Sequence, residues 1–424
     1  MIRGPAGHRR PRRPRTGRKS RLMVSSEVTT PPAGPGSMAP ARWARWAAAA
    51  AFLITGLVLS SYFVRVPSLK IKYGFTDGEL GLFFVLPVVT GLVAMQATGN
   101  LVARFGSAPI IRVTMLGLPL SLAAIGFAET RWQFALALLV FGIVDGLIDV
   151  SMNAHAVTVE RALRRPVMNS CHAAWSIGAM IGAALGGLAV KADLSPARHF
   201  LLLCGALVVL GLVAGRFLLP AAADRTQGYA TAAKPKIRWH EGWTPRIVLL
   251  GVTGTVVLVA EGAVGNWGGI FLHDELGSSL ATASLGYLAF SVFQAGGRLV
   301  GDRLQQRIGA GRLVRWAGAI AVAGLAIVVL SPLPAVAIAG FAVLGVGMSV
   351  LVPLIFSAVG HSGAESGDVN AAAALAKVNT LTYSGMLLGP VLVGWSASGV
   401  GLTLTLAGML ALLALTLVTG LRRI

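Results

Sequence analysis

Residues 96–105 read QATGNLVARF and residues 294–303 read QAGGRLVGDR, so nearly the same phrase occurs twice, 198 positions apart. Each copy lies at the end of a hydrophobic segment. A second echo supports the first, because Gly178, Gly182 and Gly187 are spaced like Gly385, Gly389 and Gly394. A chain that repeats itself at about half its length, with apolar segments in each copy, is organised like a secondary transporter.

The composition is that of an integral membrane protein. Hydrophobic residues make up 55% of the chain and charged residues 12%, and the mean hydropathy is +0.74. About half of the net charge of +20 lies in residues 1–45, which hold many Arg residues and one acid, Glu27. We expect this stretch, rich in Pro, Gly and Ser, to be a disordered basic tail that anchors the topology, with no nucleic acid as partner; binding of anionic lipid or nucleic acid is the alternative. Cys171 and Cys204 have no metal-ligand spacing, and we expect no metal or cofactor.

Twelve segments are long enough to cross a bilayer as helices. We place them at 46–66, 79–102, 109–127, 132–158, 168–190, 198–219, 246–270, 279–301, 311–330, 334–358, 371–396 and 399–420. The predicted fold is therefore all-α, with two bundles of six transmembrane helices. The domains are a tail at 1–45, a first bundle at 46–219, a cytoplasmic linker at 220–245 and a second bundle at 246–424.

The loop charges predict the orientation. Most of the 36 Lys and Arg residues fall on the side that carries the N-terminus, even when the tail is left out. The opposite side holds Arg65, Lys70, Lys72, Arg131, Lys191 and Arg198. Because positive loops stay in the cytoplasm, we expect both termini to be cytoplasmic in a multi-pass protein of the cytoplasmic membrane. We expect a monomer whose partners are the lipid bilayer, protons and a small-molecule solute.

The doubled phrase resembles the loop motif Gly-x-x-x-Asp-Arg-x-Gly of the major facilitator superfamily. Gly99, Arg104 and Gly106 match, whereas Ala103 stands where the acid is expected. In the second copy the charges are kept by Arg298, Asp302 and Arg303. In this superfamily the loop steadies one conformation through charge contacts at helix ends. The resemblance therefore implies a gating role for Arg104, Asp302 and Arg303.

The segment 145–179 is similar to the fucose-permease and rhizopine-transport-protein side of that superfamily. The similarity rests on Asp149, Asn153, Glu160, Met168, His172, Trp175, Ser176 and Gly178. The resemblance implies a secondary active transporter of a small polar solute, such as a sugar, polyol or related metabolite. Drug–proton antiporters typically carry an Arg in helix four and a Gly-Pro-x-x-Gly-Gly phrase in helix five. Here helix four carries Asp145 and Asp149 instead, and the Pro is missing from helix five. Both departures count against a drug or metabolite efflux antiporter, which stays open as the alternative.

The charges inside the apolar spans carry the candidate chemistry, because an ionisable group in a span usually faces a cavity or a partner. Asp145, Asp149 and Asn153 recur at one-turn intervals on one helix face. Two close carboxylates in an apolar span favour the binding of a proton, which suits proton coupling. Asn153 is a candidate for binding the solute. The competing interpretation is a fixed charge pair with a basic residue on a neighbouring helix.

Helix seven carries a second candidate cluster in the sequence EGAVGNW at 261–267. Glu261 is a further candidate for proton coupling, and Asn266 and Trp267 offer hydrogen bonds and a stacking face to a solute. The alternative places Trp267 in an interfacial aromatic belt.

Three more residues are weaker candidates. His172 could exchange a proton near neutral pH, although an interfacial hydrogen-bonding role fits equally well. Lys377 is a candidate gating residue that pairs with a carboxylate across the two halves, or it snorkels to the cytoplasmic surface. Asn379, on the same helix, is a candidate for binding the solute.

Two other classes of function were considered. The chain has no His-rich metal box, nucleophile elbow or phosphate-binding loop, so we expect no enzymatic activity. A receptor with the architecture of a transporter, which moves no solute, is the second alternative, and sequence does not separate it from a proton-coupled transporter.

Overall fold

The computed structural model describes residues 38–165, 167–225, 243–355 and 370–420. The regular secondary structure of these residues is helical throughout. The first half contains α1 (Met38–Tyr73), α2 (Asp77–Phe105), α3 (Ser107–Phe127), α4 (Arg131–Leu163), α5 (Met168–Lys191) and α6 (Pro196–Gly215). A short helix, α7 (Ala222–Arg225), follows. The second half contains α8 (Pro245–Ile270) with the π-helical turn η2 (Phe271–Glu275), α9 (Leu280–Ile308), α10 (Ala310–Val329), α11 (Pro334–Met348), α13 (Asn370–Val400) and α14 (Leu402–Gly420).

These helices confirm the predicted all-α membrane fold. Within the part of the chain that the structure describes, ten helices are long and apolar enough to cross a membrane, including a span at Pro334–Ile355 that extends α11. Helices α9 and α13, with 29 and 31 residues, complete the twelve spans.

The first helix begins earlier than the sequence indicated. Residues 38–45, which were expected to be part of the disordered tail, belong to α1. Ala and Arg dominate this stretch and have high helix propensity, and Pro40 lies in the first turn, where its missing N–H costs nothing. The rest of the predicted tail, 1–37, lies outside the described residues.

Glycines with positive φ mark the same turn in both halves. Gly106 (φ 84°) ends α2 and begins α3, and Gly309 (φ 82°) ends α9 and begins α10. The two glycines are 203 positions apart, whereas the repeated phrase is offset by 198. Helix α9 therefore continues further past its copy of the phrase than α2 does. By position in the turn, Arg104 corresponds to Arg307, and Arg303 lies within α9 before its end.

Small residues let helices approach closely within each half. A Cβ at Gly178 or Gly182 of α5 would meet the backbone of α1 at Leu53 or Leu57. In the second half, a Cβ at Gly385 of α13 would meet the backbone of Thr255 in α8. Such contacts pack helices in lipid, where apolar burial alone drives no association.

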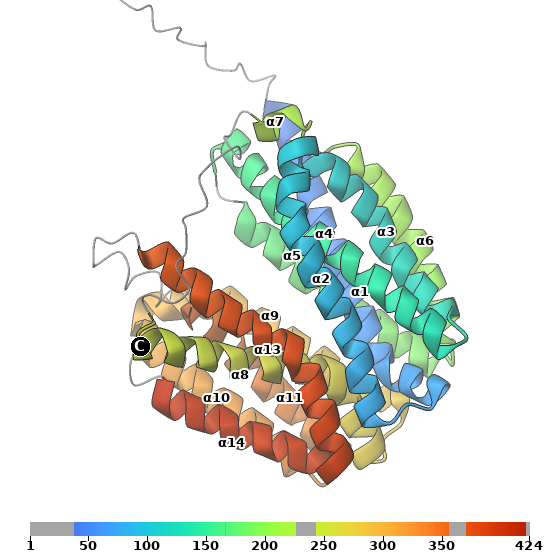
Figure 1. Cartoon of the computed structure of the whole chain (residues 1–424), viewed down its shortest axis with the longest axis vertical. Helices are drawn as coiled ribbons and strands as arrows, with labels where there is room; N and C mark the ends of the chain where they lie inside the picture. The colour runs from blue at the N-terminus through green and yellow to red at the C-terminus, as the bar shows by residue number, and fades with distance from the viewer. Residues whose placement is uncertain (1–37, 166, 226–242, 356–369, 421–424) are drawn as a thin grey trace, which may run out of the picture.

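The two bundles meet at one end of the molecule. We call the end at which α1 starts and α2 finishes the basic end, and the opposite end the distal end. At the distal end a Cβ at Gly81 of α2 would lie 3.0 Å from the carbonyl oxygen of Pro390 in α13, and one at Gly269 of α8 would lie 3.0 Å from the Pro67 ring in α1. The bundles diverge from this contact toward the basic end (Figure 1).

Candidate functional site

Asp145 and Asp149 lie on the side of α4 between its contacts with two neighbouring helices. Met152 packs toward α1, where its sulfur accepts a 3.8 Å hydrogen bond from Thr55. Gly146 packs against the backbone of α2. Helical spacing puts both carboxyl groups on the face between these two contacts, and both residues are half-buried.

The two carboxyl groups have no cationic partner within the part of the chain that the structure describes. Among the described residues, no Lys, Arg or His nitrogen lies within ion-pair distance of either group. The neighbour is Asn153, whose side-chain amide donates to the Asp149 backbone oxygen at 2.8 Å and toward its carboxylate at 3.4 Å. The described residues therefore do not form the fixed pair between an α4 carboxylate and a basic residue that was the competing interpretation. A carboxyl group left without a countercharge inside a span suits reversible protonation.

Glu261 of α8 is held by two side chains of α9. The Gln294 amide donates a 2.9 Å hydrogen bond to Glu261 Oε1, and Arg298 Nη2 lies 3.6 Å from the same oxygen. Gln294 and Arg298 are one turn apart, so they present one face of α9 to α8. The Glu261 side chain is 26% exposed. The sequence favoured an interhelical hydrogen bond or a loop-motif role for Gln294, but it did not identify Glu261 as the partner of Gln294 and Arg298.

An aromatic contact between the halves lies close to this cluster. The ring of Phe63 in α1 meets Tyr287 of α9 edge-on, with centroids 5.4 Å apart. A Cβ at Gly265 of α8 would lie 3.5 Å from the Phe63 ring, so this glycine makes room for the ring. The side-chain amide of Asn266 donates a 2.9 Å hydrogen bond to the Gly262 carbonyl oxygen. No hydrogen bond to the side-chain oxygen of Asn266 is made by the described residues.

Trp267 is fully buried in the distal contact between the halves. Its ring meets Phe84 of α2 edge-on at 5.7 Å, and a Cβ at Gly394 of α13 would lie 3.1 Å from its ring edge. The indole N–H has no hydrogen-bond acceptor among the described residues. The interfacial aromatic belt considered from sequence does not fit this burial. In this conformation Trp267 packs beneath the closed end instead of lining an open face.

His172 is exposed on α5 and meets Phe52 of α1 edge-on at 5.1 Å. Among the described residues, the ring contact of His172 is with Phe52, and no contact ties its side chain to Asp149 or to Glu261.

Lys377 lies inside α13 and is only 2% exposed. Its Nζ lies 5.2 Å from the centroid of the Trp243 ring, a cation–π contact within the second half. Burial of this kind does not agree with snorkelling to the surface. The side chains of Asn379 and Asp302 lie outside the described residues. Arg104 and Arg303 are exposed near the basic ends of α2 and α9.

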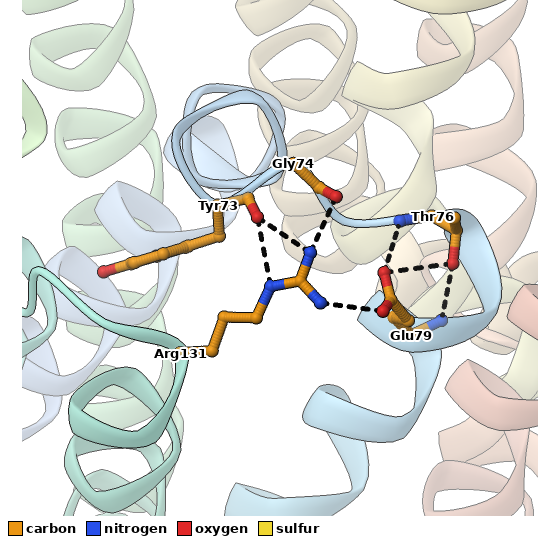
Figure 2. Close-up of polar contacts among 5 residues, drawn as sticks. All are labelled: Tyr73, Gly74, Thr76, Glu79 and Arg131. Carbon is orange, nitrogen blue, oxygen red and sulfur yellow. Dashed lines mark hydrogen bonds and ion pairs between the residues drawn. The ribbon is translucent and has the colours of Figure 1, made fainter.

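At the distal end, Arg131 ties the start of α4 to the turn between α1 and α2. Figure 2 shows its guanidinium between the Glu79 carboxylate, at 2.7 Å, and the backbone oxygens of Tyr73 and Gly74, at 3.0 and 2.9 Å. Glu79 also caps α2 together with Thr76. Arg131 and all the residues that it contacts belong to the first half, so this cluster stabilises one bundle.

Lys70, also at the distal end, forms an ion pair between the two bundles. Its Nζ lies 2.5 Å from Asp77 of α2 and 2.5 Å from Asp274 of η2. Among the residues that the structure describes, Lys70–Asp274 is the ion pair that joins the two halves. We call these three residues the distal latch.

The fold and these sites can be compared with known proteins. The sequence model described as Major Facilitator Superfamily matches residues 47–377. The chain belongs to this superfamily. It is 32% identical over 377 residues to the uncharacterized transporter y4wD of Sinorhizobium fredii, covering 88% of this chain and 97% of the relative. It is 31% identical over 351 residues to the membrane protein MosC of Rhizobium meliloti, covering 83% of each.

Solved structures show the same fold. A mutant of the nucleoside transporter NupG aligns with a TM-score of 0.73 at 11% identity, covering 91% of this chain and 99% of that one. A bacterial homologue of the human lysosomal transporter Spinster, in an inward-facing and occupied conformation, aligns with a TM-score of 0.72 at 12% identity, covering 90% and 96%. The superfamily resemblance drawn from the sequence is confirmed, and the chain is a multi-pass membrane transport protein.

Proposed function

We propose that this protein is a proton-coupled secondary transporter of a small polar solute, a sugar, polyol or related metabolite, and that it works by alternating access. The observation that carries the proposal is the pair of half-buried carboxyl groups, Asp145 and Asp149, on one face of α4 without a countercharge. A group that must take up and release a proton inside a membrane needs burial without a permanent ionic partner.

The solute site is the space between the halves beside Glu261. The carboxylate of Glu261 accepts hydrogen bonds from hydroxyl groups, and the guanidinium of Arg298 donates them. Phe63 and Tyr287 add an apolar aromatic wall from both halves. A few polar groups against an aromatic surface suit a small hydroxylated molecule. Asn266 lies on the same helix as Glu261, and Asn153 borders the carboxyl pair; His172 of α5 stays a candidate for proton exchange.

The conformation fits one state of the cycle. The loop charges place the basic end in the cytoplasm, together with both chain ends, in the cytoplasmic membrane. The contact between the distal ends and the divergence of the bundles toward the basic end (Figure 1) support the assignment of an inward-facing state. We expect a monomer to complete the cycle, because each half supplies part of the site.

The test starts with a thermal-shift screen of the purified protein against sugars, polyols and metabolites. The stabilising solute is then used in proteoliposomes with and without a pH gradient. Wild type should accumulate the solute against its gradient when protons flow inward, whereas accumulation under the opposite gradient identifies an efflux antiporter. Asp149→Asn keeps the shape but removes the titrating group, so uphill accumulation should be lost while downhill exchange persists.

The matched control is Glu129→Gln, which removes an exposed carboxylate from the loop before α4. It should transport like wild type. Accumulation by Asp149→Asn in response to a pH gradient would exclude this residue as the coupling group. Binding without any flux in wild type would favour a receptor over a transporter.

A further inference from the structure

A recess of about 470 Å³ opens at the distal end, between the two halves. The first half contributes α1 and the turn between α5 and α6, and the second half contributes the start of α9. The charged side chains in its walls are Arg65, Lys191 and Asp193. This recess is separate from the Glu261 cluster and has no part in the proposed solute site.

Arg65 is a buried cation without a negative partner. It is 3% exposed, and its Nε and Nη2 donate to His199 Nδ1 at 3.3 Å and to the Leu194 backbone oxygen at 2.6 Å. Both acceptors are uncharged, because an imidazole that accepts a hydrogen bond at Nδ1 is neutral. Among the described residues no carboxylate lies within ion-pair distance of the guanidinium, and its Nη1 has no acceptor. Buried charges in proteins are normally paired, so this arrangement lacks an anion.

The opposite wall offers donors that an anion requires. Ser279 caps the N-terminus of α9, a helix of 29 residues, by accepting from the Thr282 N–H at 3.1 Å. Leu280 and Ala281 line the recess, and their backbone N–H groups precede the first intrahelical bond. An unbonded first turn carries partial positive charge and binds anions. Arg65 from one half and the α9 terminus from the other thus border the same recess.

The wall charges set the charge of the ligand. Arg65 and Lys191 contribute two positive charges and Asp193 contributes one negative charge, which leaves a net +1. A monoanion balances this sum. A tetrahedral oxyanion with several acceptor oxygens could use guanidinium, ammonium and backbone donors together.

We propose that the distal recess binds a phosphate-type monoanion, either the phosphodiester of a phospholipid headgroup or free dihydrogen phosphate. Both sources share the same acceptor chemistry. The walls come from both halves, so an anion in the recess links Arg65 of α1 to the start of α9 while the distal end is closed. When that end opens, the two walls separate and the site is divided.

The test measures thermal stability of the purified protein in an uncharged detergent. Three titrations are compared at equal ionic strength: sodium chloride, inorganic phosphate, and dihexanoyl phosphatidylglycerol. We expect a saturable rise in Tm of several degrees with one or both phosphate probes and none with chloride. Arg65→Gln and Lys191→Gln should each weaken the apparent affinity by about tenfold, the usual effect of one lost charge-assisted hydrogen bond.

Arg198→Gln is the matched control, because Arg198 is an exposed cation of the same turn that does not line the recess. It should respond like wild type. Arg65 also ties α1 to the α5–α6 turn, so Lys191→Gln, at an exposed position, keeps the test valid if Arg65→Gln does not fold. A response to phosphatidylglycerol alone supports the lipid source, and a response to inorganic phosphate supports the free anion. No saturable shift in wild type, or equal shifts in Lys191→Gln and Arg198→Gln, would overturn the proposal.

Discussion

Replacing Asp274 by Asn should loosen the closed distal end of the protein. Asp274 holds the partner charge in the distal latch, and Lys70 lies 2.5 Å from it across the boundary between the halves. The substitution removes the ionic contact between halves and leaves the contact of Lys70 with Asp77 in place. Because Lys70 keeps one carboxylate, no buried charge is left unpaired, and folding should be preserved.

The size of the effect follows from the exposure of the pair. The side chains of Lys70 and Asp274 are 15% and 36% exposed, so solvent screens their attraction in part. A partly exposed ion pair contributes about 1 kcal/mol. The contact exists only while the distal end is closed, so all of this energy acts on the equilibrium between closed and open ends. Its loss should raise the open-to-closed ratio by about fivefold.

The measurement is the distance distribution between spin labels at the distal ends of the two halves, attached at Glu129→Cys and Leu404→Cys. The native Cys171 and Cys204 are buried and should label poorly. Asp274→Asn should add population at longer distances, more so at low ionic strength.

The control is Glu79→Gln, which breaks the pair of Glu79 with Arg131 inside the first half. These two residues move together, so the distribution should not change. An unaltered distribution in Asp274→Asn, or an equal change in Glu79→Gln, would refute the argument.

Two further predictions concern packing and the basic end. Gly182→Leu should reduce the folded yield and lower Tm, because the new side chain would meet the backbone of Leu57. Overpacking of this kind costs about 1–3 kcal/mol or more. The control is Gly205→Leu, which should behave like wild type because Gly205 has open space around it. Lys377→Ala should raise the inward-facing population roughly tenfold if Lys377 pairs with Asp149 when the basic ends close, and an unchanged label distance between the basic ends of α4 and α13 would exclude that pairing.

The parts of the fold that depend on local composition could be predicted. The twelve spans followed from segment length and hydropathy, because a bilayer fixes how many apolar residues a helix needs. The start of α1 was misplaced because Arg42 and Arg45 suggested a soluble tail, whereas the Ala-rich sequence around them continues the helix. The repeated phrase has an offset of 198 positions, whereas the turns that end α2 and α9 are 203 positions apart. The position of the phrase therefore did not predict where each helix ends; Gly106 and Gly309 mark those ends.

The candidate site was predicted only in part. Asp145, Asp149 and Glu261 stood out because charges are rare in apolar spans. Trp267 was assigned to the solute, yet this structure buries it between α2 and α13, a placement that depends on how the two halves close. The partner of Lys377 in α13 was equally unreadable, because Trp243 lies far away along the chain.

The sequence by itself determined that the chain crosses a membrane, that it is duplicated, and which mid-span residues carry charge. Each of these is a property of composition or of spacing along one segment. Only the tertiary structure decided that Glu261 meets Gln294, 33 positions away, and that Lys70 meets Asp274, 204 positions away. It also decided that Arg65 is buried with no carboxylate of the described residues at ion-pair distance. Such contacts depend on the distance between helices that are remote in sequence, and no local pattern of residues encodes that distance.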